Sequence, residues 1–130
     1  MINVIIIALL PVLGALMDGF QHEGRKLLGS FFKSAFLGVI CYFLILDLTI
    51  WYVLYLLLCW WVLFDPIYNG VRKLGWFYVG KTKWTDRFLR WLCDKLPIFN
   101  KFAKGQYSHV SFITKLMALV LTIGLIFIKL

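Results

Sequence analysis

Charged side chains are scarce in this sequence. Asp, Glu, Lys and Arg make up 15% of its 130 residues, whereas about 25% is usual in soluble proteins. A soluble domain of this length buries only about two thirds of its unfolded surface, so it needs many polar residues to cover the rest. The composition therefore excludes an ordinary soluble enzyme.

Cysteines are also few, and flexible linkers are missing. Cys41, Cys59 and Cys93 are too few for a disulfide framework, and their spacing fits no metal site. We expect free thiols, no metal and no cofactor. No Gly/Ser-rich linker, low-complexity tract or repeat divides the chain, so residues 1–130 are expected to form a single membrane domain.

Apolar residues make up 62% of the chain and gather in long segments. The predicted spans cover residues 2–17, 27–46, 48–64 and 110–128. Segments of this length and polarity cross a bilayer as helices, because a helix satisfies its own backbone hydrogen bonds. We therefore expect an all-α, polytopic integral membrane protein with about four transmembrane helices.

The apolar run over residues 35–64 allows two interpretations. As one helix it would extend about 45 Å, which exceeds the roughly 30 Å hydrocarbon core, and Asp47 would lie near the bilayer centre. A split at Asp47 gives a helical hairpin in the middle of the chain, with Asp47 at its tip as a helix N-cap. We favour the hairpin over the single helix.

Basic residues are unevenly distributed along the chain. Arg25, Lys26 and Lys33 lie at the first connection, and nine more lie within residues 65–109. Because Lys and Arg accumulate in cytoplasmic loops, four spans would place both regions in the cytoplasm and both termini outside. We expect the protein to lie in a bacterial inner membrane or in a virion-type membrane.

The segment 65–109 is a basic loop rich in aromatic residues, and within it Thr85–Leu96 is predicted to form a short amphipathic helix in the membrane interface. Packing of this helix on a protein partner is the alternative. We expect the loop to bind anionic lipids rather than nucleic acid. The residues predicted to bind headgroups are Arg72, Lys73, Lys81, Lys83, Arg87 and Arg90, and the predicted interface aromatics are Trp60, Trp61, Trp76, Tyr78, Trp84 and Trp91.

Residues 75–82 match the pattern G-x-x-x-x-G-K-[ST] of a phosphate-binding loop. Such a loop requires a preceding strand and a surrounding parallel sheet, and its backbone must approach the phosphates closely. The middle positions here are large and apolar, and the loop lies between membrane spans. We expect no nucleotide binding, and we expect Gly75 and Gly80 to bend the chain at the interface.

Small residues recur every four positions on two predicted helices. They are Ser30, Ser34 and Gly38 on the second predicted span and Thr114, Ala118 and Thr122 on the last predicted span. Such stripes allow helices to approach closely. They predict either packing within the chain or self-association with a second copy.

Ionisable residues lie close to the predicted helix ends. Asp65-Pro66 is expected to end the third helix, and Lys115 is expected to reach interfacial water. Catalytic motifs are missing from the sequence, as are the paired charges within spans that a transporter or an intramembrane enzyme would need.

These observations favour a non-enzymatic structural or assembly protein. It would be anchored in a bilayer and present its basic aromatic loop to anionic headgroups and to a protein partner or a second copy. The alternative is a holin-like pore former, since the chain resembles holins in size and composition. An intramembrane enzyme or transporter is the least supported class.

Overall fold

The computed structural model of the protein describes residues 1–45, 49–81 and 83–130, without the side chains of residues 102 and 103. In these ranges the chain is all helical, with 83% helix and no strand. The elements are α1 (Ile2–His22), α2 (Lys26–Ile45), α3 (Ile50–Val71), α4 (Trp84–Lys95), α5 (Pro97–Ala103) and α6 (Tyr107–Lys129). The all-α class is confirmed, and α4 corresponds to the predicted amphipathic helix. The short α5 was not predicted.

The four long helices α1, α2, α3 and α6 are each long and apolar enough to cross a membrane. Three of them exceed their predicted spans, and α3 shows why. It continues through Asp65 and Pro66 to Val71, so the predicted helix end at Asp65-Pro66 is wrong. Pro66 is buried and so are Tyr68 and Asn69, so tertiary packing of the last turn offsets the hydrogen bond that proline removes.

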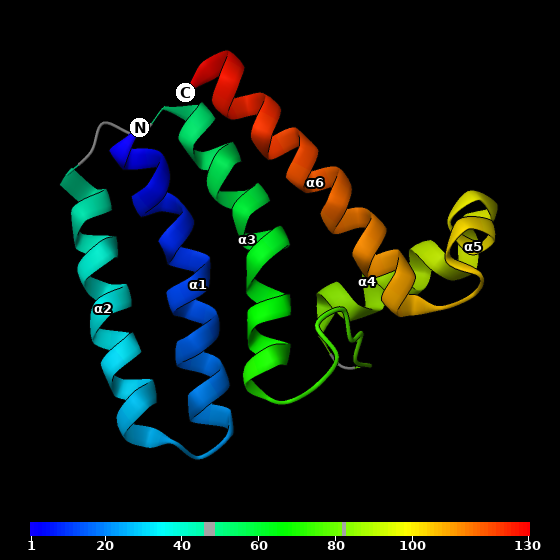
Figure 1. Cartoon of the computed structure of the whole chain (residues 1–130), viewed down its shortest axis with the longest axis horizontal. Coiled ribbons are helices and arrows are strands. Elements are labelled where there is room, and N and C mark those ends of the chain that lie inside the picture. Colours follow the sequence, from blue (N-terminus) through cyan, green and yellow to red (C-terminus); the bar gives the residue numbers. More distant parts are fainter. Residues whose placement is uncertain (46–48, 82) are drawn as a thin grey trace.

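The long helices form a row rather than a compact bundle. Packing contacts join α2 to α1, α1 to α3, and α3 to α6, and Figure 1 shows the order α2, α1, α3, α6 across the molecule. The predicted break between the second and third helices is confirmed, although its tip at Asp47 lies outside the described residues. The two helices of this hairpin do not pack against each other, because α1 lies between them.

Small residues allow α1 to occupy this central place. A Cβ atom added at Gly19 would lie 2.9 Å from the side chain of Val71 on α3, and one at Gly14 would lie 3.2 Å from Trp60. Ala15 is also buried. Close approach at these positions needs small side chains. Small-residue packing was predicted for the second and last helices only, whereas the structure shows it on α1.

The helices of the row run side by side, so the molecule has two sides at which helices begin or end (Figure 1). The N- and C-termini lie on one of these sides. The α1–α2 turn and the loop after α3 lie on the opposite side, which we call the basic end because both basic regions are there. There α4 packs against the start of α6. Leu89, Leu92 and Cys93 of α4 are buried with Val79 and Val110. This core, together with the hydrogen bonds from Asn69 to the loop, positions the loop beside the last turns of α3.

Candidate functional site

A buried ion pair joins α3 to α6 near the basic end. Nζ of Lys115 lies 3.3 Å from Oδ2 of Asp65, and it also donates to Oγ of Ser111 at 3.3 Å. The same ammonium lies 4.9 Å from the ring centroid of Trp61. Lys115 is only 3% exposed. A charge buried in this way is stable only with a partner, so Asp65 and Lys115 must be positioned together.

Two expectations about charge are corrected by this pair. Charged residues of two long helices do pair, because Asp65 of α3 meets Lys115 of α6, and Lys115 is buried in the protein rather than in contact with interfacial water. The pair went unnoticed because the third helix was ended at Asp65, which placed this carboxylate in a loop. In the structure Asp65 lies within α3, and Lys115 lies about 12 Å along α6 from the first residue of that helix.

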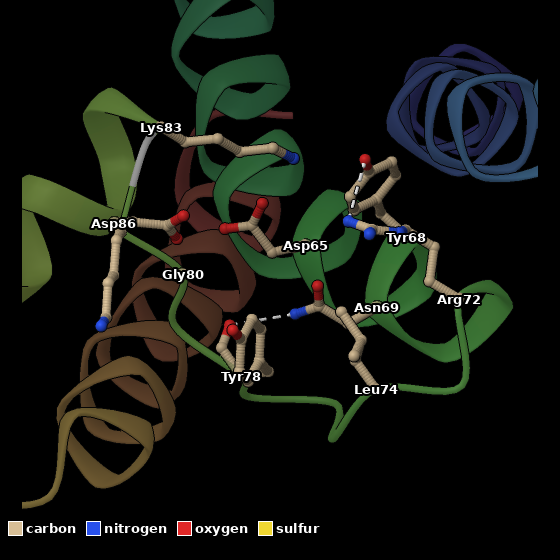
Figure 2. A pocket seen from close by; sticks show the side chains of 10 residues that line it. Asp65, Tyr68, Asn69, Arg72, Leu74, Tyr78, Gly80, Lys83 and Asp86 are labelled. Atoms are coloured by element: carbon tan, nitrogen blue, oxygen red, sulfur yellow. Dashed lines mark hydrogen bonds between the residues drawn. The ribbon is translucent and has the colours of Figure 1, made fainter. Parts of the chain in front are cut away.

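A cavity of about 350 Å³ opens beside this pair, between the last turns of α3, the loop that follows it and the start of α4. Figure 2 shows its lining side chains. We call it the polar pocket, because nine of its ten lining residues are polar, charged or glycine. Its lining residues are Asp65, Tyr68, Asn69, Arg72, Leu74, Tyr78, Gly80, Lys81, Lys83 and Asp86.

Two carboxylates face each other in the polar pocket. Figure 2 shows the carboxylates of Asp65 and Asp86 turned toward one another from α3 and α4. Burial raises the pKa of Asp86, and the negative charge of Asp65 raises it further. The backbone N–H of Gly80 donates to the Asp86 carboxylate and opposes that rise. A Cβ atom at Gly80 would lie 2.6 Å from Oδ2 of Asp86, so this position favours glycine.

Cations and aromatic rings form the rest of the pocket wall. Nζ of Lys83 lies 3.7 Å from the ring centroid of Tyr68. The guanidinium of Arg72 lies 5.4 Å from the same ring and donates to its hydroxyl at 3.4 Å. Asn69 donates through Nδ2 to the carbonyl oxygens of Trp76 and Tyr78, which holds the loop against α3. The pocket thus has both positive and negative groups in a fixed frame.

The predicted headgroup residues divide into three groups. Arg72, Lys81 and Lys83 line the polar pocket. Lys73 and Arg87 are exposed outside it. The sixth residue, Arg90, is directed into the protein.

Arg90 holds the loop in place. It donates from Nε to the Gly80 carbonyl at 2.7 Å and from Nη2 to the Val79 carbonyl at 3.2 Å. Its guanidinium lies 4.3 Å from the ring centroid of Tyr107. These contacts give Arg90 a structural role within the chain.

The phosphate-loop pattern lies in a different setting from that of a nucleotide site. It follows a helix, α3, rather than a strand, and its last residue, Thr82, lies outside the described residues. The backbone of Gly80 binds the carboxylate of Asp86, and a carboxylate at that position repels phosphate. The expectation of no nucleotide binding stays a prediction.

Aromatic residues of α4 form an exposed stripe. Trp84, Phe88 and Trp91 stack in sequence, with ring centroids 5.9 Å and 6.2 Å apart, and their exposures are 71%, 39% and 53%. We call them the α4 stripe. Of the other predicted aromatics, Trp60, Trp76 and Tyr78 are exposed, and Trp60 also stacks on Phe64. Trp61 is half-buried and lies between Lys115 and Phe88.

The two small-residue stripes have different surroundings. The α2 stripe, which consists of Ser30, Ser34 and Gly38, is exposed throughout, and a Cβ atom at Gly38 would meet nothing within 4 Å. The α6 stripe consists of Thr114, Ala118 and Thr122; Ala118 and Thr122 are buried and Thr114 is half-buried. The α6 stripe therefore packs within the chain, and the α2 stripe is open to a second copy or to lipid.

Sequence reasoning missed Asp65, Tyr68, Asn69, Asp86 and Lys115 as site residues. One signal was available, because Asp65, Asn69 and Arg72 have the spacing i, i+4, i+7, which places them on one helix face. That signal depends on a helix that continues through Pro66.

Comparisons with protein-family models, curated proteins and solved structures found no match to this chain. Within the described residues, no three His, Cys, Asp or Glu side chains gather as a metal site requires. The polar pocket is therefore interpreted from its own chemistry.

Proposed function

We propose that this chain is an integral membrane protein that anchors in a bilayer and binds anionic lipid headgroups at its basic end. Its four long helices expose large apolar side chains, such as Leu27, Phe31 and Ile123, which lipid would cover. With four spans, the basic end lies on the cytoplasmic side and both termini lie outside. The role is structural or assembly-related rather than enzymatic.

The exposed α4 stripe is the observation that carries this proposal. Three stacked aromatic rings lie beside the exposed cations Lys83 and Arg87 at the basic end. Aromatic residues settle at headgroup depth, and nearby Lys and Arg attract anionic lipid by about 1 kcal/mol each. The inner side of α4 is occupied by its own core, so the stripe is free to meet the membrane.

Lipid retention by the purified full chain tests this proposal. Lys73→Gln with Arg87→Gln removes two exposed cations outside the polar pocket. The change should lower retention of phosphatidylglycerol about tenfold or more relative to the unaltered chain. Lys129→Gln is the control, because it removes an exposed cation at the end of α6 where the chain termini lie. A loss of retention in Lys129→Gln as large as in the double variant would contradict a specific role of the basic end.

Position in the membrane needs a separate measurement. Single cysteines replacing Thr49 and Lys73 lie at opposite ends of α3. In a background without native cysteines, an impermeant thiol reagent should label them from opposite sides of a sealed vesicle. Labelling of both from one side would refute the four-span arrangement.

A holin-like pore former is the alternative function. The open α2 stripe favours it, because small residues there would let a second copy approach closely. Release of a trapped dye from vesicles that contain the purified chain would favour the pore. Retention of the dye at the same protein density would favour the anchoring role.

A further inference from the structure

The polar pocket holds groups of both charges in one cavity. Its volume of about 350 Å³ lies within the roughly 300–1,000 Å³ range of small-molecule sites. Asp65 and Asp86 are half-buried, whereas Lys81 and Lys83 are exposed. The carboxylates therefore lie deeper in the pocket, and the lysines lie nearer its mouth.

A ligand of a single charge does not fit this lining. A bare anion would meet the two carboxylates that face each other in Figure 2. A bare cation would meet three basic groups, Arg72, Lys81 and Lys83. A ligand with a negative group toward the mouth and a positive group toward the interior would pair with both the basic side chains and the carboxylates. Separation of the two charges across one small cavity therefore defines the ligand class.

Hydrogen bonding indicates the chemical type of the ligand's positive group. Carboxylate oxygens accept hydrogen bonds, and a primary ammonium offers three N–H donors, whereas a trimethylammonium offers none. Lysine ammonium groups already use this wall, since Lys115 donates to Asp65 and Lys83 lies over Tyr68. The wall therefore suits a primary ammonium that arrives from outside.

We propose that the polar pocket binds a phosphate ester carrying a primary ammonium group, the chemistry of an ethanolamine phospholipid headgroup. The phosphate contacts Lys81 and Lys83 near the mouth and the half-buried Arg72 in the wall, and the ammonium contacts Asp65 and Asp86. This inference rests on the proposed function, because it takes the basic end to lie at headgroup depth. It adds a selective site for one headgroup to the general attraction of anionic lipid.

Competitive lipid binding to the delipidated full chain tests the inference. The probes are phosphatidylethanolamine, phosphatidylcholine and phosphatidylglycerol with identical acyl chains, and native mass spectrometry counts the lipids bound. Phosphatidylethanolamine should bind about tenfold or more tightly than phosphatidylcholine, the ratio expected from one charge-assisted hydrogen bond. Equal binding of the two lipids would overturn the inference.

Variants assign the selectivity to the pocket. Asp86→Asn keeps the acceptor for the Gly80 N–H but removes the charge, so the ethanolamine-to-choline ratio should fall to about one. Asp86→Glu should keep most of the ratio, and Asp18→Asn, which lies outside the lining, should leave it unchanged. Lys83→Gln should weaken both lipids alike, because both carry the phosphate. An unchanged ratio in a folded Asp86→Asn chain would overturn the inference.

A soluble competitor separates the two sources of this chemistry. Glycerophosphoethanolamine that displaces the lipid shows that the headgroup alone is recognised, and failure to displace it shows that the acyl chains are also required. This competition is informative only when the protein binds phosphatidylethanolamine more tightly than phosphatidylcholine. The ratio is independent of phosphatidylglycerol retention in the Lys73→Gln, Arg87→Gln variant, so failure of the selective site and failure of the proposed function give different results.

Discussion

The helices α2 and α6 each carry a stripe of small residues and one lysine inside an apolar run. On α2 the stripe is exposed and so is Lys33. On α6 most of the stripe is buried, and Lys115 is 3% exposed and paired with Asp65 of α3. Helix packing in lipid has no hydrophobic driving force, so it depends on close fit and on polar partners. The difference shows that a small-residue stripe packs where a neighbouring helix supplies the partner.

Removal of that partner should destabilise the packing of α6 more than any other single change considered for α2 or α6. Asp65→Ala leaves the ammonium of Lys115 buried and unpaired, so the free energy of unfolding should fall by about 3–5 kcal/mol. Thermal unfolding in detergent, followed by circular dichroism, measures the loss. Lys33→Ala on α2 is the control and should stay within about 0.5 kcal/mol of the unaltered chain.

A double variant distinguishes the contribution of the two charges from that of the volume of the two side chains. Asp65→Leu with Lys115→Met removes both charges at similar volume, and such replacements of buried pairs are often neutral or stabilising. The double variant should recover most of the stability that Asp65→Ala loses. If it is as unstable as the single variant, the pair is not the reason that α6 packs on α3.

Overpacking of the α6 stripe should have the next largest effect. Ala118 is 7% exposed, so Ala118→Leu places three further carbon atoms in a filled space. The cost should be about 1–3 kcal/mol of unfolding free energy, measured by the same thermal unfolding. Val120→Leu is the control, because it adds a carbon atom at an exposed position of the same helix. Stability equal to that of the unaltered chain would place Ala118 against lipid.

Local patterns predicted the elements of this fold better than their arrangement. Long apolar runs and the Thr85–Leu96 pattern gave four long helices and α4, because these signals depend only on neighbouring residues. The order of the helices in the row could not be predicted from these local patterns, because it depends on the close approach of Gly14 and Gly19 of α1 to α3. No local pattern indicates which helix occupies the centre.

The candidate site was less predictable than the fold. Arg72, Lys81 and Lys83 were predicted to bind headgroups from charge and aromatic neighbours, and they line the pocket. The carboxylates were missed because the third helix was ended at Asp65-Pro66. Proline usually ends a helix, and only the burial of Tyr68 and Asn69 beyond it explains why α3 continues.

Titration of Asp86 should change the free energy of unfolding by less than these substitutions do. The pKa of Asp86 is raised by burial and then by Asp65, whereas Lys83 and Arg90 oppose the rise. Between the ordinary pKa of aspartate and this raised value, the folded chain binds more protons than the unfolded chain. Stability should therefore fall as pH rises through that window.

Removal of the ionisable group tests the assignment. Asp86→Asn should flatten this part of the profile of unfolding free energy against pH and raise stability slightly at neutral pH. Asp94→Asn is the matched control, because it removes an exposed carboxylate of the same helix. A profile unchanged by Asp86→Asn would assign the dependence to another group.

The smallest effect on stability is expected at Gly38. A Cβ atom there meets nothing within 4 Å inside the chain, so Gly38→Leu should change the unfolding free energy by less than about 0.5 kcal/mol. Leucine would nevertheless hold a second helix away, because close approach needs small side chains. If the α2 stripe joins two copies, sedimentation in detergent should show fewer oligomers for Gly38→Leu than for Ser34→Ala, which keeps the position small. Equal oligomer size in both variants would assign the α2 stripe to lipid. The contrast between α2 and α6 would then reflect the partner that Asp65 provides to Lys115 and nothing in the stripes themselves.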